Sequence, residues 1–315
     1  MRPVLQVFTA ATLPERPAPF QALDRIAAVE LGDELPPETY AAIQATLWTH
    51  PFSRTALEAW LLEVEGEPVA MFEAFRVTAR RRVLPDAPVE HLQAMVLGSG
   101  FVPRGLRRAG HGRTLADAVC DHHVAQGAAL AYGLVEASLK VYSHADQTRP
   151  VVERWFPAAP DAAADSTAEG LEPLFDLAGW TPPPLLGTVD VLLTAEMLDW
   201  RLERVALERP QDRARPIGAR LGADFIVWST EADDDALEIL HLRADDARVP
   251  ALIAAACREA AARGLKAAKI WESTRLDTCL PPGARRTLDA VFAVGRYLPG
   301  IDAEGWLDLQ IGHIF

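Results

Sequence analysis

The chain has 315 residues and carries 31 lysines and arginines against 44 aspartates and glutamates, a formal net charge of −13. Half of its residues are apolar, which is enough for more than one core, so we expect two domains. The acidic balance argues against a nucleic-acid surface, which needs a broad basic face. No uncharged apolar run of about 18 residues occurs, so no membrane span is expected.

The N-terminus and the cysteines indicate a cytoplasmic, reduced protein. Residues 1–8 are too short and too polar-flanked for a signal peptide and predict a first strand instead. Cys120 and Cys257 lie in apolar helical segments, where a buried, inert thiol is expected. No zinc-ligand spacing occurs, and Asp233-Asp234-Asp235 is typical of a solvated hairpin turn, so no metal is expected.

The predicted elements of the first domain alternate between strands and helices. In chain order they are a strand over residues 1–8, helices over 21–29 and 37–47, strands over 60–64, 68–80 and 92–102, a helix over 113–126 and a strand over 128–137. Glu65-Gly66-Glu67 separates two of the strands as a hairpin turn. We expect this domain to cover residues 1–193.

A second, smaller α/β domain is expected over residues 194–315. Its predicted elements are a helix over 195–208, hairpin strands over 225–228 and 236–243, a helix over 249–263 and a strand over 267–272. This order is a degenerate echo of the first domain. Its tryptophans are expected in the core or between domains: Trp200, Trp228, Trp271 and Trp306.

The most informative segment is Arg107-Arg108-Ala109-Gly110-His111-Gly112, between a predicted strand and a predicted helix. Glycines at such a turn let backbone N–H groups converge on one point, where the helix dipole adds positive potential. This arrangement binds anions, and arginine suits phosphate. An ordinary tight turn with solvated arginines is the alternative interpretation of so short a motif.

The surrounding charge favours the anion site. Between Arg76 and Arg113, only Asp86 and Glu90 oppose the basic residues Arg76, Arg80, Arg81, Arg82, Arg104, Arg107, Arg108 and Arg113. A local basic island in an acidic chain indicates a site for a small polyanion. The second domain has no equivalent glycine turn, so it is not expected to bind this ligand in the same way.

Phe101-Val102-Pro103 followed by Arg107-x-x-Gly110-x-Gly112 resembles the acyl-CoA loop of the GCN5-related N-acetyltransferases. Phe72-Glu73-Ala74-Phe75-Arg76 adds a resemblance to the fungal lysine N-acetyltransferase branch. The well-matched stretch covers residues 60–115. The resemblance implies an α/β fold whose mixed central sheet splays between the strand ending at Val102 and the strand over 128–136.

The resemblance also implies acetyl-CoA as co-substrate, with main-chain amides of the turn on its pyrophosphate and the preceding strand along its pantetheine. The residues placed at the coenzyme are Phe101, Val102, Arg107, Arg108, Ala109, Gly110, His111, Gly112 and Arg113. Acetyl transfer further needs a carboxylate or water to deprotonate the amine and a donor for the developing oxyanion.

Glu73 is the first candidate for the base, because a carboxylate between Phe72 and Phe75 is costly to bury without a partner. Its alternative role is a surface glutamate on an alternating strand. Glu136 is a further candidate, and Glu90 and Gln93 are second choices.

The proton donor expected from the resemblance is a tyrosine, but the matching position holds Phe175, which has no hydroxyl. Tyr142 is a substitute candidate, with a wet, structural tyrosine as the alternative. One of His122 and His123 is expected to face solvent whichever way their helix is turned, so a surface role is preferred for them.

These observations predict an N-acetyltransferase that acts on a small, lysine-like amine, with no nucleic-acid or membrane partner. The second domain is expected to cover the acceptor cleft or to form a homodimer contact. A non-catalytic acyl-CoA-binding or sensor protein is the alternative, because the acid is missing at Phe175. A nucleotide-phosphate protein of another class is disfavoured, since neither a P-loop nor a dinucleotide fingerprint is present.

Overall fold

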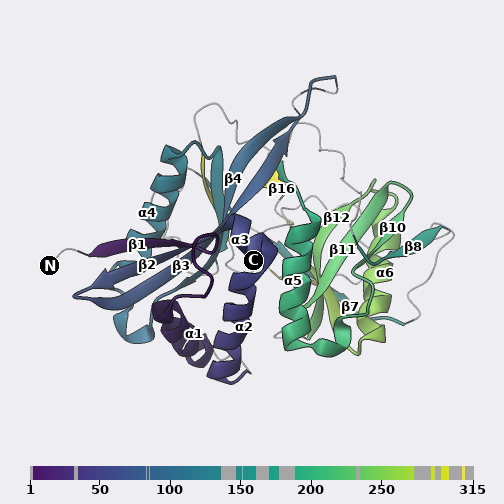
Figure 1. Ribbon diagram of the computed structural model, residues 1–315. Coiled ribbons are helices and arrows are strands. Elements are labelled where there is room, and N and C mark those ends of the chain that lie inside the picture. Colours follow the sequence, from purple (N-terminus) through teal and green to yellow (C-terminus); the bar gives the residue numbers. More distant parts are fainter. Residues whose placement is uncertain are drawn as a thin grey trace.

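The computed structural model contains two mixed β-sheets, each covered by helices, with α5 between the two halves (Figure 1). The structure describes residues 3–31, 35–82, 84, 86–135, 147–150, 152–160, 170–176, 189–231, 235–272, 285–287, 292–297 and 307–308. None of the helices in these ranges is both long and apolar enough to cross a membrane.

The first half contains the strands and helices predicted from the sequence, in the predicted order, together with two short helices that were not predicted. In chain order these elements are β1 (Val4–Thr9), α1 (Ala18–Leu31), α2 (Pro37–Thr49), α3 (Pro51–Ala56), β2 (Leu57–Val64), β3 (Glu67–Arg81), β4 (Glu90–Phe101), η1 (Arg104–Leu106), α4 (His111–Ala125) and β5 (Leu130–Val135). The two short helices are α3 and η1. Glu65 and Gly66 have φ of 59° and 86°, as a two-residue hairpin between β2 and β3 requires. His50 begins α3 by accepting the Phe52 N–H through Nδ1 at 3.2 Å.

The rest of the chain alternates between the two sheets. The remaining elements are β6 (Gln147–Pro150), β7 (Val152–Pro157), β8 (Leu171–Leu174), β9 (Val189–Val191), α5 (Ala195–Glu208), η4 (Pro210–Asp212), β10 (Gly218–Leu221), β11 (Asp224–Glu231), β12 (Ala236–Arg243), α6 (Val249–Ala262), β13 (Ala267–Glu272), β14 (Arg285–Thr287), β15 (Phe292–Tyr297) and β16 (Leu307–Asp308). The first sheet has the order β1-β2-β3-β4-β5-β15-β6, and the second β14-β7-β13-β12-β11-β10-β8.

The strand order shows that the two sheets do not separate at residue 193. β7 and β8 precede that residue but pair in the second sheet, whereas β15 follows it and pairs with β5 in the first. The two halves also share a core, in which Phe75 of β3 meets Trp200 of α5 edge to face at 5.3 Å. The division into domains over 1–193 and 194–315 stays a prediction.

The first sheet is covered on both faces, as Figure 1 shows. α1, α2 and α3 pack on one face through residues such as Phe20, Trp48 and Phe52. α4 packs on the other face through Leu115 and Val119, among others. This packing fixes the N-terminus of α4 near the end of β4, because only Val102 to Gly110 separate the two elements.

The second sheet repeats part of this arrangement without the glycine turn. β10, β11 and β12 are antiparallel, and α6 leads back to β13, which is parallel to β12. The chain between β12 and α6 carries Asp245 and Asp246 where the first half has its glycines and arginines. These carboxylates would repel phosphate. That the second half does not bind the coenzyme in the same way stays a prediction.

Buried thiols and tryptophans agree with the sequence-based predictions. Cys120 and Cys257 are free and buried, and burial raises the pKa of Cys257 to about 11. Trp200, Trp228 and Trp271 are also buried. Trp306 lies outside the described residues.

Candidate functional site

The strands β4 and β5 separate part-way along their length. Their parallel pairing runs from Ala94–Leu130 to Leu97–Gly133 and stops there, although both strands continue. Beyond Leu97, β4 stays paired with β3 alone, and Ser99 and Gly100 are exposed. The predicted splay is therefore present, and it leaves main-chain groups of β4 open to an extended ligand.

A bulge in β4 marks the point where the strands part. Phe72 pairs with Gly100 and Ala74 pairs with Leu97, so Glu73 on β3 faces two residues, Gly98 and Ser99. A bulge bends its strand and redirects the backbone groups beside it. The sequence analysis missed this feature, although two glycines so close together in a strand are a signal for it.

The glycines of the bulge region are required by the aromatic side chains packed on them. A Cβ on Gly98 would lie 2.9 Å from Phe75, and one on Gly100 would lie 2.8 Å from Phe72. Phe75 is fully buried and has no room to move.

We therefore expect Gly98→Ala to lower the free energy of unfolding by about 1–3 kcal/mol, the usual cost of overpacking a core. Urea denaturation measures this loss. Gly105→Ala is the matched control, because a Cβ there meets nothing within 4 Å. Equal stability of the two variants would show that the bulge tolerates a side chain.

The turn after β4 has the geometry expected of an anion site. Arg108 and Gly110 have φ of 73° and 85°, and Gly110 immediately precedes the first residue of α4. The Thr114 N–H bonds the Gly110 carbonyl at 2.9 Å, so the amides of His111, Gly112 and Arg113 are those of the first helical turn, which have no partner within the helix. They point from the helix N-terminus, where an anion is stabilised.

The structure explains why positions 110 and 112 of the turn are occupied by glycine. Gly110 adopts the left-handed conformation, and a Cβ there would project into open space. Gly112 lies against the end of β4, since a Cβ there would be 3.3 Å from Val102 Cγ2. The first glycine therefore permits the left-handed turn, and the second brings the helix close to the residue that follows the strand.

The Arg107 side chain stabilises the turn through contacts with neighbouring residues. Its Nε donates to the Val102 carbonyl at 2.9 Å, and its Nη2 lies 3.2 Å from Glu30 of α1. Glu30 also accepts the Arg104 N–H at 2.7 Å. Sequence reasoning missed Glu30, which contacts the turn only through the folding of α1.

The basic island is divided by the fold. Arg104, Arg107, Arg108 and Arg113 surround the turn, but Arg76 and Arg80 to Arg82 follow the far half of β3. Arg76 contacts Glu58, and Arg81 bonds Glu90 at 2.7 Å. Only the first group is placed to meet a ligand at the turn.

The coenzyme-site residues of β4 have unequal exposure. Phe101 is buried and pairs with Met71 of β3. Val102 is partly buried, and Arg107 already occupies its carbonyl. The edge of β4 open to a ligand is thus at Ser99 and Gly100.

Glu73 is buried and paired. Its side chain enters the layer under α1, where Arg16 Nη1 donates to its Oε1 at 2.6 Å. Arg16 also bonds Asp24 through Nε and Nη2 at 2.7 and 2.8 Å. Both Phe20 and Trp48 lie within 6 Å of the guanidinium, at 5.3 and 5.7 Å. Within the described part of the chain, no hydrogen bond reaches Glu73 Oε2.

The other candidates are distributed over different parts of the molecule. Glu136 and Tyr142 lie outside the described residues. Phe175 follows β8 in the second sheet and is 60% exposed, so it does not face the splay. Glu90 is held by Arg81.

Gln93 lines a cavity of about 640 Å³ between α3, the β3–β4 pair and the start of α5. Phe52 in the cavity wall stacks on Phe75 at 6.0 Å, and Phe75 contacts the bulge at Gly98. One aromatic layer therefore separates this cavity from the point where β4 and β5 part.

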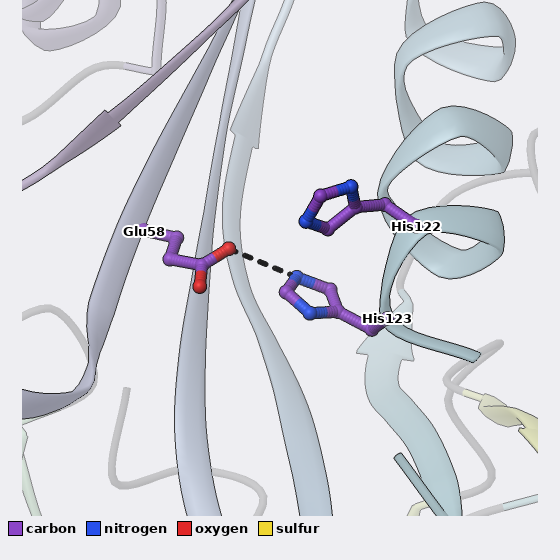
Figure 2. Close-up of side chains that lie close together, drawn as sticks. All are labelled: Glu58, His122 and His123. Carbon is purple, nitrogen blue, oxygen red and sulfur yellow. Dashed lines mark ion pairs between the residues drawn. The ribbon is translucent and has the colours of Figure 1, made fainter. Parts of the chain in front are cut away.

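One of His122 and His123 was expected to face solvent, with a surface role for the pair. His122 is half-buried and His123 is 1% exposed, so a surface role is wrong for His123. Both rings point from the last turn of α4 toward Glu58 of β2 (Figure 2). Trp60 packs edge-on against them, with ring centroids 4.9 and 5.9 Å away. The crossing of α4 over β2, which helix periodicity alone does not reveal, buries this end of the helix.

No protein-family model matches the sequence, and no curated protein matches it. Solved structures are similar in fold. A conserved protein from Enterococcus faecalis V583, whose suggested activity is N-acyl transfer, has a TM-score of 0.56 at 10% identity, over 94% of this chain and 73% of that one. A Pyrococcus horikoshii protein, whose proposed activity is acetyl transfer, has a TM-score of 0.54 at 11% identity, over 94% and 89%.

A GCN5-related N-acetyltransferase from Anabaena variabilis ATCC 29413 has a TM-score of 0.52 at 12% identity, over 93% of this chain and 73% of that one. At these identities the likeness concerns the fold alone. The chain therefore has an α/β fold of the GCN5-related N-acetyltransferase type, as the sequence predicted. The resemblance to the fungal lysine N-acetyltransferase branch stays a prediction.

Proposed function

We propose that this protein transfers an acetyl group from acetyl-CoA to the amino group of a small amine, by direct attack within a ternary complex. The observation that carries the proposal is the continuity of β4 with the turn. The strand leaves β5 after Leu97 and leads, through Pro103, into the amides at the N-terminus of α4. The extended pantetheine arm of acetyl-CoA would lie along the open edge of β4. The diphosphate at the end of that arm would then lie at the amides of α4.

The chain's own residues supply the binding groups for the coenzyme. The amides of His111, Gly112 and Arg113 would bind the pyrophosphate, with Arg108 and Arg113 adding charge. Main-chain groups near Ser99 would pair with the pantetheine and serve as the donor for the oxyanion. Arg107 and Glu30 would hold the turn in shape.

Glu73 is the proposed base, acting on the amine directly or through water. Arg16 occupies its Oε1, so its Oε2 is the oxygen available to accept a proton. Tyr142 and Glu136 stay proposed as the proton donor and a second carboxylate. A cationic acceptor such as a lysine-like amine suits the acidic chain, whose net charge is −13.

A non-catalytic acyl-CoA-binding protein is the second candidate, favoured by one observation. The position that corresponds to the family's tyrosine holds Phe175, which lies at the second sheet. Thiol release from acetyl-CoA across a panel of amines separates the two: release with any amine supports the enzyme, and binding without release supports the sensor.

Gly110→Val is the variant that tests the coenzyme site. A β-branched residue is strained at a φ of 85° and fills the open space above the amides. We expect the affinity for CoA to fall by about tenfold or more, equivalent to about 1.4 kcal/mol. Isothermal titration of CoA measures the change.

Gly105→Ala, with a free Cβ position in the adjacent turn, is the control and should bind CoA as the native protein does. ATP and NAD serve as competing ligands in thermal-shift experiments. Stronger stabilisation by either of them than by CoA, or unchanged CoA affinity in Gly110→Val, would contradict the proposal.

A further inference from the structure

Glu58, His122 and His123 form a cluster of metal-ligating side chains away from the proposed coenzyme site. Glu58 is the second residue of β2, and the two histidines lie in the last turn of α4, opposite the end that starts at the glycine turn (Figure 2). One donor atom from each residue can be chosen so that all lie within 4.8 Å of one another. Ligand atoms that lie about 2.0–2.2 Å from a zinc ion are closer together than this, so the side chains would rotate toward the ion on binding.

The centre of the cluster holds buried polar atoms without hydrogen bonds. Glu58 Oε2 and His123 Nε2 are 3.3 Å apart, but the geometry of this contact is not that of a hydrogen bond, and both atoms are inaccessible to solvent. Glu58 is 4% exposed and His123 1%. Leaving such an atom unsatisfied is unfavourable, so a ligand that satisfies both atoms would be favoured.

The donor atoms of the cluster are of the kinds that transition metals bind. Imidazole nitrogen suits zinc, copper, iron and nickel, and a carboxylate oxygen completes the ligand set in some zinc sites. Two nitrogens and one oxygen, with a fourth position left for water, match the ligand set of zinc sites that are open on one side.

Two neighbours orient the cluster. Arg76 donates to the other oxygen of Glu58, Oε1, and so turns Oε2 toward the histidines, as an outer-shell partner does. Gln126, an exposed residue, lies 2.7 Å from His122 Nε2 and marks the side that faces solvent. An ion would therefore reach the cluster from the side on which Gln126 lies.

We propose that Glu58, His122 and His123 bind a divalent transition-metal ion, with zinc as the first ion to test. The ion would join the C-terminal turn of α4 to β2. It would stabilise the helix whose other end forms the glycine turn. This site does not depend on the acetyl-transfer proposal, because its ligands and those of the coenzyme lie at opposite ends of α4.

The test is titration of Zn²⁺ into the full chain after removal of metals with a chelator. We expect one ion per chain, a raised melting temperature, and visible absorption bands when Co²⁺ replaces Zn²⁺. His122→Ala should weaken Zn²⁺ binding at least about tenfold and abolish the Co²⁺ bands. His122 is half-buried at the rim, so this variant keeps the core intact.

His91→Ala is the matched control, because His91 is exposed on β4 and outside the cluster. It should bind Zn²⁺ as the native protein does. Glu58→Gln, which keeps the shape of the side chain, is the second ligand variant and should also weaken binding. The proposal is overturned if the native protein and His122→Ala bind Zn²⁺ equally, or if the native protein binds none.

Discussion

Glu73→Gln is expected to lower kcat for acetyl transfer by about 10²–10⁴-fold, the usual contribution of a positioned general base. The amide keeps an oxygen for the hydrogen bond from Arg16, so the packing under α1 should survive. It cannot take a proton from the amine or from a water. Steady-state kinetics with acetyl-CoA and the best amine of the panel measures the effect, with KM for acetyl-CoA expected to stay unchanged.

Glu67→Gln at the exposed start of the same strand is the control, because it removes an equal charge far from the bulge. Its kcat should match that of the native protein. If Glu73→Gln also keeps native kcat, Glu73 is a purely structural partner of Arg16. The base would then have to come from another residue, for which Glu136 is the next candidate.

The parts of the fold and the site that local sequence encodes were predictable. Gly110 and Gly112 lie two residues apart between a strand and a helix, and this spacing alone indicated the turn that the structure shows. The pairing of β2 with β3 across the turn at Glu65 and Gly66 likewise depends on neighbouring residues. Such features need no knowledge of which helix packs on which face.

The features that sequence did not reveal are contacts between distant residues. Arg107 meets Glu30 across 77 residues, and Arg16 meets Glu73 across 57. Both pairs form only because α1 and the segment before it pack against the sheet. This packing buries the Arg16–Glu73 pair, whereas the Arg107–Glu30 pair stays at the surface. The sequence also did not reveal that β7 pairs in the second sheet and β15 in the first. The periodicity of a strand does not specify which strands lie beside it.

Arg16→Met is expected to lower the free energy of unfolding at pH 7.5 by about 3–5 kcal/mol, because it leaves two buried carboxylates without their cation. Arg16 is 3% exposed, Asp24 1% and Glu73 7%. Methionine has a similar length and keeps the contact with Phe20 and Trp48. Urea denaturation measures the loss, and Arg25→Met, which breaks the exposed pair with Glu38, should cost at most about 1 kcal/mol.

The pH dependence distinguishes an electrostatic loss from a packing loss. Burial raises the pKa of Asp24 above its usual value even with Arg16 present, and Arg16 opposes this shift. Without Arg16 the pKa rises further, so the folded state takes up a proton at higher pH than the unfolded chain. The penalty is then full at neutral pH and shrinks as the pH falls through the folded-state pKa of Asp24. The stability deficit of Arg16→Met should therefore be smaller in acid than at pH 7.5, and adding Asp24→Asn with Glu73→Gln should restore part of the loss at pH 7.5. A deficit of the same size at both pH values would mean that Arg16 stabilises the fold through its packing, and the buried carboxylates would not depend on its charge.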